Sequence, residues 1–287
     1  MAGAGTVGGG RRLVLVNRRR FLRHRGDPDE PEPAPLPTFE AVTTDVGELL
    51  LPAHDSVMRA LMKRTGDWEL DEASLFASLL RPGMTVLDVG AHVGYYTLLA
   101  ARLLGPEGRV IAVEADPDNA ALLAANVARN RAGNVEIVKA AAWNQTGRVA
   151  LRRNPQNTGD HRVLGEAPTA GGVEVDSIAL DDWLGEDPIH AVKVDAQGSD
   201  HIAIQGMERA LRRWHPIVFV EFYPKGIEEL GRDPTDVAAY YRSLDARLTM
   251  PGLQADFDAW LPQDFVSSAK RLPGGFGTIV IRPRRTT

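Results

Sequence analysis

The chain has 287 residues, a net charge of −5 and no cysteine. That length can bury a full core in one large domain with a small appendage, and the missing cysteines exclude disulfides, thiolate metal sites and a cysteine nucleophile. The negative charge disfavours an electrostatic nucleic-acid binder, and no apolar run approaches the roughly 20 residues of a membrane span. We therefore expect no nucleic-acid partner, no membrane partner, and a reducing cytoplasm as the location.

Residues 1–35 differ from the rest of the chain. A glycine-rich start leads into an arginine-rich stretch over 11–25, which is followed by alternating proline and acid over 27–33. Such a composition cannot bury enough apolar surface to offset the entropy lost on ordering. We predict a mostly disordered arm here, and no signal peptide, because no apolar segment is followed by a cleavage site.

Residues 36–80 are predicted to form an N-terminal hairpin and a helical cap. The hairpin turns near 45–47, and helices follow over about 55–64 and 70–80. Asp71 is the expected N-cap of the second helix, because a short acidic side chain can accept from the free N–H groups of the first turn.

From residue 81 to residue 287, which we predict to form one domain, strand and helix signals alternate as in an α/β fold. The strands are nearly continuous in valine, isoleucine and alanine, as expected for a parallel sheet buried on both faces. Strands are predicted at 84–88, 109–113, 135–139, 190–195 and 216–221. Helices are predicted near 95–104, 117–130, 200–212 and 234–245. Weaker signals predict short strands near 149–151 and 172–175, a short helix over 178–184, and a late antiparallel edge strand over 277–281.

The segment 86–97, VLDVGAHVGYYT, carries the strongest functional signal. An apolar strand runs into a turn in which Gly90 and Gly94 allow sharp bending and close approach to a ligand, and open α/β sheets bind ligands beyond such strand ends. The spacing is not that of a dinucleotide loop, and it fits the loop that holds the amino-acid part of S-adenosylmethionine (SAM). We therefore predict that residues 81–287 form a SAM-binding domain. The cofactor-binding residues predicted here are Asp88, Gly90, Ala91, His92, Gly94, Tyr95, Tyr96 and Thr97.

Two residues of this segment have alternative roles. Asp88 either holds the glycine loop in shape or contacts the amino group of SAM. His92 is expected to act mainly as backbone scaffolding, with contact to the ligand carboxylate as the alternative.

Further cofactor contacts are predicted after the next two strands. Glu114, followed by Ala115, ends the second strand, where an acid can accept both ribose hydroxyls of a nucleoside; the alternative is a cap on the following helix. Ala142 and Trp143 follow the third strand and are expected to border the adenine. Trp143 either shields the base or belongs to the core.

Asp195 and Glu221 end the next two strands and are predicted to flank the reacting group. Two carboxylates at adjacent strand ends can polarise a hydroxyl, act as a base or share a divalent cation, so they are also the candidate metal ligands; the alternative is hydrogen bonding to loop amides. His161 lies in a polar loop that could close over the ligand, and it is the first histidine candidate for a general base. No metal-spaced histidine cluster occurs, so a zinc site is not expected.

With these residues in place, the chain resembles the FkbM family of SAM-dependent methyltransferases. The matching stretches run from about Gly47 to about Pro224, and their order and spacing together are specific. They are Gly66–Glu69, Leu87–Thr97, Glu114–Pro117, Asn157–Gly159, Ile178–Trp183 and Val192–Gly198. The resemblance implies an α/β, class I methyltransferase (Rossmann-like) fold, with a seven-stranded, mostly parallel sheet, an antiparallel last strand and helices on both faces.

The resemblance also implies methyl transfer from SAM, usually to oxygen on a natural product or sugar. Two positions depart from the family: His92 stands where asparagine is usual, and Gln197 stands where glutamate is usual. If that glutamate helps as a base or metal ligand in relatives, the task is left to Asp195, Glu221 and His161.

We therefore expect O-methylation of a small-molecule acceptor, with Asp195 or His161 as the base and Glu221 orienting the acceptor or helping to bind a divalent cation. Trp68 and Glu69 are expected to roof the site; the alternative for Trp68 is an ordinary packed tryptophan. The alternatives are methylation of nitrogen, methylation of a carboxylate, and a SAM-binding protein without catalysis. The sequence leaves the acceptor and the oligomeric state open.

Overall fold

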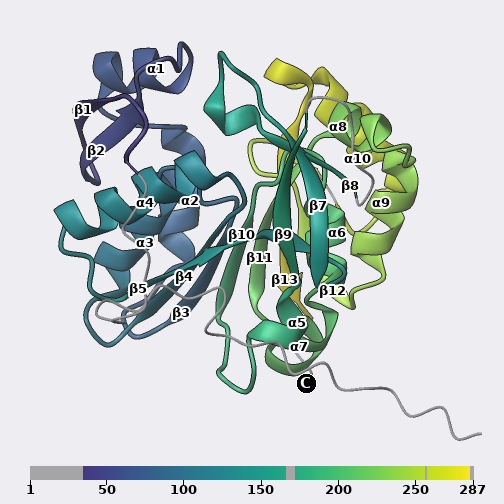
Figure 1. Cartoon of the computed structure of the whole chain (residues 1–287). Coiled ribbons are helices and arrows are strands. Elements are labelled where there is room, and N and C mark those ends of the chain that lie inside the picture. The colour runs from purple at the N-terminus through teal and green to yellow at the C-terminus, as the bar shows by residue number, and fades with distance from the viewer. Residues whose placement is uncertain (1–34, 166–171, 256, 285–287) are drawn as a thin grey trace, which may run out of the picture.

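A seven-stranded sheet runs through the middle of the computed structural model, which describes residues 35–165, 172–255 and 257–284 (Figure 1). Neighbouring strands from β11 to β5 are parallel, and β13 is antiparallel to both of its neighbours. In spatial order the strands are β12 (Ala246–Thr249), β13 (Gly277–Pro283), β11 (Ile217–Phe222), β10 (Ala191–Val194), β3 (Thr85–Val89), β4 (Arg109–Glu114) and β5 (Val135–Lys139). The prediction of a mostly parallel, seven-stranded class I methyltransferase sheet is confirmed.

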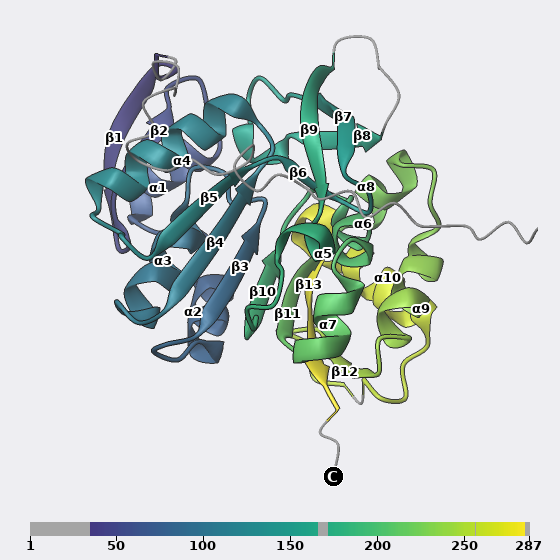
Figure 2. The same cartoon turned by 60° about the horizontal axis from the view of Figure 1, so that its bottom comes forward.

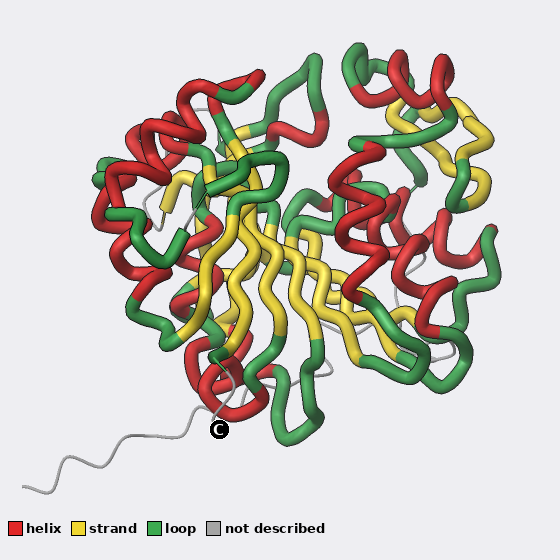
Figure 3. The backbone as a smooth tube through the Cα atoms, turned by 180° about the vertical axis from the view of Figure 1, so that it is seen from behind, coloured by secondary structure: helices red, strands yellow, loops and turns green. Residues whose placement is uncertain are grey.

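Helices cover both faces of this sheet, as Figure 3 shows from behind. Side chains alternate between the faces along each strand, so that Val86 and Leu87 of β3 belong to two different cores. The core around Val86 takes in α1 (Met58–Thr65), α2 (Leu70–Leu79), α3 (Tyr95–Leu104) and α4 (Pro117–Arg129). The core around Leu87 takes in α5 (Leu180–Trp183), α6 (Asp200–Gln205), α7 (Glu208–Trp214), α8 (Pro224–Glu229), α9 (Pro234–Arg242) and α10 (Pro262–Arg271).

The predicted hairpin is present as β1 (Phe39–Thr44) and β2 (Gly47–Pro52), an antiparallel pair. It is fixed to α4 by Asn126, whose side-chain amide accepts from the N–H of Leu50 at 2.7 Å and donates to its carbonyl at 3.2 Å. The hairpin and α1 pack on the face of the main sheet that α2, α3 and α4 cover. The arm predicted over residues 1–35 lies outside the described residues, except for its last residue.

A second sheet lies beyond the carboxyl ends of the main strands (Figure 2). It contains the two short strands predicted near 149–151 and 172–175. Its order is β6 (Ala141–Trp143), β9 (Val173–Ala179), β7 (Gly147–Arg152) and β8 (Arg162–Gly165). Residues 153–161, which we call the β7–β8 loop, connect two of these strands and reach over the main sheet. The short helix predicted over 178–184 begins only at Leu180, because residues 178–179 end β9.

Other predictions need correction. The helix expected over 200–212 is broken into α6 and α7 at Gly206, where a Cβ would lie 2.0 Å from the carbonyl oxygen of Trp143. The late strand β13 is not at the edge, because the unpredicted strand β12 pairs with its outer side. The N-cap of α2 is Glu69, with Asp71 inside the first turn. No helix within the described ranges is long and apolar enough to cross a bilayer.

Candidate active site

The carboxyl ends of β11, β10, β3 and β4 lie side by side and carry the predicted polar residues. Two cavities meet there, a larger one of about 280 Å³ and a smaller one of about 60 Å³. They share part of their lining and therefore adjoin. The shared residues are Gly90, His92, Gly159, Asp195 and Gln197.

Gly90 brings the loop after β3 against the loop after β10. Its φ of 77° is in the left-handed region, and a Cβ on it would lie 1.8 Å from the carbonyl oxygen of Asp195. The N–H groups of Gly90 and Ala91 both donate to the carbonyl of Val113 in β4. Only glycine fits this contact, which places three strand ends around the shared part of the two cavities.

Asp88 lines the larger cavity with a carboxylate that is only half satisfied. Oδ2 accepts from the Thr97 hydroxyl at 2.6 Å, whereas the buried Oδ1 has no partner among the described residues. Burial raises the pKa of Asp88, although the nearby Lys193 opposes the shift. A buried acceptor without a donor is costly, and a ligand ammonium group would satisfy it. Thr97 lines neither cavity and holds Asp88 from behind.

Glu114 lies in the smaller cavity. Its Oε2 accepts from the N–H of His92 and its Oε1 from the N–H of Asp116, each at 2.8 Å. Burial raises the pKa of Glu114 to about 7, against the effect of these two bonds. Each oxygen has a further lone pair, so this carboxylate can accept two more donors from a ligand. The helix cap is supplied instead by Asp116, whose Oδ1 accepts from two N–H groups of α4.

Some of the remaining predicted cofactor residues line one of the two cavities, and others lie outside both. Ala115 and Ala142 line the smaller cavity, and Ala91, Tyr95 and Tyr96 line the larger one. Gly94 lies outside both, at the N-cap of α3. Trp143 also lies outside both, because its side chain packs into a separate core with Val149, Leu151 and Ile202. Of its two predicted roles, the structure favours the core role.

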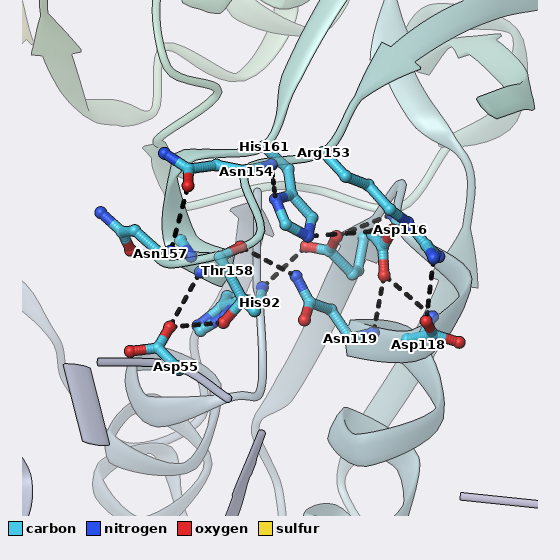
Figure 4. A network of polar contacts seen from close by, with 12 residues as sticks. Asp55, His92, Asp116, Asp118, Asn119, Arg153, Asn154, Asn157, Thr158 and His161 are labelled. Carbon is cyan, nitrogen blue, oxygen red and sulfur yellow. Dashed lines mark hydrogen bonds and ion pairs between the residues drawn. The ribbon is translucent and has the colours of Figure 1, made fainter. Parts of the chain in front are cut away.

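The β7–β8 loop is tied to the site by a chain of polar contacts (Figure 4). Oδ2 of Asp55 accepts from both the N–H and the hydroxyl of Thr158, at 2.8 and 2.7 Å. Nε2 of His92 lies 2.8 Å from the same hydroxyl oxygen, and burial lowers the pKa of His92 to about 4. Since the hydroxyl proton goes to Asp55, the neutral His92 ring donates from Nε2. Asn119 of α4 also donates to the Thr158 carbonyl, at 3.1 Å.

His161 lies in the same network and lines only the smaller cavity (Figure 4). Its Nδ1 accepts from the N–H of Asn154 at 3.1 Å, and its Nε2 is 4.0 Å from Oδ2 of Asp116. Burial lowers its pKa, although Asp116 opposes the shift. With one ring nitrogen bonded to the backbone and the other facing Asp116, His161 is placed to shape the loop, and the geometry does not favour it as the base.

The larger cavity is lined by four acids and one lysine. Lys193 donates to Oδ2 of Asp195 at 2.9 Å, and its ammonium lies 4.2 Å from the centre of the Tyr96 ring. Gln197 donates to the other oxygen, Oδ1, at 2.9 Å. Burial alone would lower the pKa of Lys193, but its acidic neighbours outweigh it and the pKa is raised. The acids are Glu69, Asp88, Asp195 and Glu221.

Burial raises the pKa of two other acids in this cavity, Glu221 and Glu69. Burial, followed by repulsion from Asp195, raises the pKa of Glu221 well above its usual value, and its Oε2 has no partner among the described residues. Burial also raises the pKa of Glu69, to about 7. Both shifts favour the protonated form, and Glu69, with its pKa of about 7, can gain or lose its proton near neutral pH.

Within the described residues, no group of three or more His, Asp and Glu side chains could hold a metal ion. Asp195 is instead neutralised by Lys193. A divalent cation at Asp195 and Glu221 has no support in the structure.

Sequence reasoning missed three contributors to this site: Asp55, Lys193 and the bond from Gln197 to Asp195. Lys193 could have been found, because residues two apart on a strand share a face and so bring its ammonium to Asp195. Asp55 could not, because it lies 103 positions before Thr158 in the chain.

A family model described as the methyltransferase FkbM domain matches residues 88–248, which is more than half of the chain. The chain belongs to the FkbM family of SAM-dependent methyltransferases. The predicted family is thus confirmed, and the matched region contains the strand ends that line both cavities.

Curated relatives match over short segments. The chain is 46% identical over 58 residues to an arsenite methyltransferase of Halobacterium salinarum, which is 20% of this chain and 15% of the relative. It is 41% identical over 59 residues to a protein-L-isoaspartate O-methyltransferase of Methanothrix thermoacetophila, covering 21% of this chain and 28% of the relative. The chain thus spans less than a third of the length of these relatives.

Two solved structures are similar at low identity. An FkbM methyltransferase of Methylobacillus flagellatus KT has a TM-score of 0.48 and 19% identity, over 73% of this chain and 47% of that one. A SAM-dependent O-methyltransferase of Thermotoga maritima has a TM-score of 0.43 and 17% identity, over 86% of this chain and 79% of that one.

Proposed function

We propose that the protein transfers the methyl group of SAM to a hydroxyl oxygen of a small-molecule acceptor such as a natural product or sugar. The observation that carries the proposal is the pair of adjoining cavities at the strand ends, with Glu114 in one and Asp88 in the other. Residues 81–287 would hold the cofactor. Residues 36–80 would cap the acceptor side, since Val57, Met58 and Trp68 line the larger cavity.

The residues present fit the cofactor. The two oxygens of Glu114 would accept the ribose hydroxyls, and the unpartnered Oδ1 of Asp88 would accept from the amino group. Gly90 keeps the loop free of a side chain where the amino-acid part would pass. When bound, SAM supplies a methyl group activated by the positive charge on sulfur.

The acceptor side favours a neutral or cationic molecule. Glu69, Asp195 and Glu221 line the larger cavity, and Lys193 is already paired with Asp195. A carboxylate acceptor would find no free cation among the described residues that line this cavity, and any of these acids in its ionised form would repel it. Of the three acceptor chemistries expected from the sequence, this disfavours carboxyl methylation. The net charge of −5 likewise favours a small molecule over a nucleic acid.

The test uses SAM carrying a labelled methyl group. Purified protein is incubated with a polar cell extract and, separately, with methyl α-D-glucopyranoside, myo-inositol, benzylamine and benzoate. We expect label in a product that resists alkali, because methyl ethers survive conditions that release methanol from methyl esters. Label only in an alkali-labile or amine product would overturn O-methylation. Binding of S-adenosylhomocysteine (SAH), the demethylated cofactor, without transfer to any acceptor would favour the non-catalytic alternative.

A further inference from the structure

An alcohol acceptor must lose its proton as the new carbon–oxygen bond forms, so the larger cavity must offer a proton acceptor. Asp195 is poorly suited to this task, because Lys193 and Gln197 each donate to one of its oxygens. These two bonds commit each oxygen of Asp195 to a neighbouring side chain. Burial and repulsion from Asp195 raise the pKa of Glu221 and so favour its protonated form, which cannot accept a further proton.

Glu69 is held at the cavity by its backbone. It has φ 50° and ψ 53°, a left-handed conformation that is uncommon for any residue with a side chain. It occupies the N-cap of α2, yet its side chain makes no cap hydrogen bond there. The side chain instead accepts from the hydroxyl of Tyr96 at Oε2, at 3.1 Å. Oε1 has no hydrogen-bond partner among the described residues and is available to a ligand. A strained backbone that aims a side chain into a cavity is typical of a functional site.

The charges around Glu69 set its proton affinity near neutral pH. Burial raises its pKa to about 7; repulsion from Asp195 and Glu72 acts in the same direction, and Lys193 and the Tyr96 hydroxyl oppose it. Glu221 also interacts with Glu69, and its own raised pKa favours the uncharged form, which weakens the repulsion between them. A general base is most effective when its pKa lies near the working pH.

We propose that Glu69 is the general base that removes the proton from the acceptor hydroxyl, an inference that rests on the proposed function. In this step the acceptor oxygen forms a bond to the methyl carbon, the carbon–sulfur bond breaks with its electron pair kept by sulfur, and the hydroxyl proton moves to Oε1 of Glu69. The proton then leaves to water. Asp195 acts as a positioning residue that fixes Lys193 over Tyr96, which in turn holds Glu69.

The side chain of Gln197 agrees with these roles of Glu69 and Asp195. In place of the family's usual glutamate, its amide donates to Asp195, which an ionised glutamate could not do. The base would then lie in the segment between α1 and α2, whereas Asp195, at the end of β10, would have a structural role.

The test compares Glu69→Gln with Asp71→Asn, an exposed acid in the first turn of the same helix. Carbon-13 signals of labelled glutamate side chains are titrated in the SAH complex, and the signal lost in Glu69→Gln is assigned to Glu69. We expect it to titrate between about pH 6 and 7.5. Methyl transfer to the hydroxyl acceptor found above should fall about 10²–10⁴-fold in Glu69→Gln, with unchanged SAH affinity, and should be unaffected in Asp71→Asn.

Further outcomes decide between these possibilities. Tyr96→Phe removes the donor that stabilises the ionised form, so the acid limb of the rate profile should move to higher pH. A Glu69 signal that titrates near 4.5, or a near-normal transfer rate in Glu69→Gln, would overturn the assignment. Failure of SAH to bind the wild-type protein would instead overturn the proposed function, which keeps the two failures distinct.

Discussion

The contact at Gly90 allows the sharpest test of a single residue in the cofactor loop. Gly90→Ala should abolish SAH binding, because the new Cβ would overlap the carbonyl oxygen of Asp195. Gly83→Ala is the matched control: Gly83 has a similar φ of 79°, but a Cβ added there would meet no other part of the chain within 4 Å. Gly83→Ala should therefore lose only about 1–2 kcal/mol of stability in thermal unfolding, because of backbone strain. Equal SAH affinity in both variants, measured by calorimetry, would contradict this role of Gly90.

Glu114 tests the nucleoside end of the site. In Glu114→Gln the side-chain NH₂ must face a backbone N–H, from His92 or Asp116, and one acceptor for the ribose is lost. We expect SAH binding to weaken by about 1–3 kcal/mol in calorimetry. Asp118→Asn, in the first turn of α4 and exposed, should bind SAH as the wild type does. A wild-type SAH affinity in Glu114→Gln would show that Glu114 does not bind the ribose.

At this scale the sequence predicts residues whose partners are close in the chain or at neighbouring strand ends. Asp88, Gly90 and Glu114 lie where the strand–turn–helix pattern places them. The sequence predicts Glu69 only as part of a roof, because its proton affinity depends on Asp195 and Lys193, more than 120 positions later. Trp143 is ambiguous in the sequence for a similar reason: its packing against Ile202 is a tertiary contact that no local pattern encodes.

Among the elements, the β7–β8 loop depends on Asp55. Its Oδ1 accepts from the N–H of Met58 at the start of α1, and its Oδ2 holds Thr158. Asp55→Asn keeps the bond from Met58 but turns an NH₂ group toward the two Thr158 donors, which should release the loop. We expect amide hydrogen exchange over 153–161 to accelerate about tenfold or more, for a loss of about 1.5 kcal/mol. Asp233→Asn, at the N-cap of α9, is the control, because that side chain accepts from Thr235 within its own helix. Unchanged exchange in Asp55→Asn would show that other contacts hold the loop.

The element predictions succeed where the apolar pattern is long and fail where it is short. The sequence predicts β4 and β11 because each is a nearly continuous apolar run buried on both faces. It does not predict β12, whose four residues alternate between buried and partly or fully exposed positions. It also misses the break at Gly206, since the helical pattern continues through that position and only the carbonyl of Trp143 on another strand requires glycine there.

Across the whole molecule, several acids are buried at the strand ends. Burial raises the pKa of Glu69, Glu114 and Asp200 to about 7, and also raises that of Asp88 and Glu221. Such a cluster lowers the stability of the ligand-free protein, because each acid is harder to ionise in the folded state. A cationic cofactor would relieve part of this penalty.

The sign of the resulting pH dependence follows from the direction of these shifts. An acid whose folded pKa is raised stabilises the fold fully below its unfolded value of about 4.5, and that contribution is lost as pH rises through about 7. The lowered pKa values of His92, His161 and His201 act in the opposite direction, but only below about pH 6.5. We therefore expect the unfolding temperature of the ligand-free protein to fall between about pH 6.5 and 8.

Calorimetric or fluorescence melting over that range checks this expectation. Glu221→Gln replaces a strongly shifted acid by a group that does not titrate, so the fall should become shallower. Glu186→Gln, an exposed acid paired with Arg213, should leave the slope unchanged, because that pairing lowers its pKa and keeps its titration out of the range. An unfolding temperature that rises over the same range would mean that the buried acids are ionised in the folded protein, with water or ions reaching the strand ends.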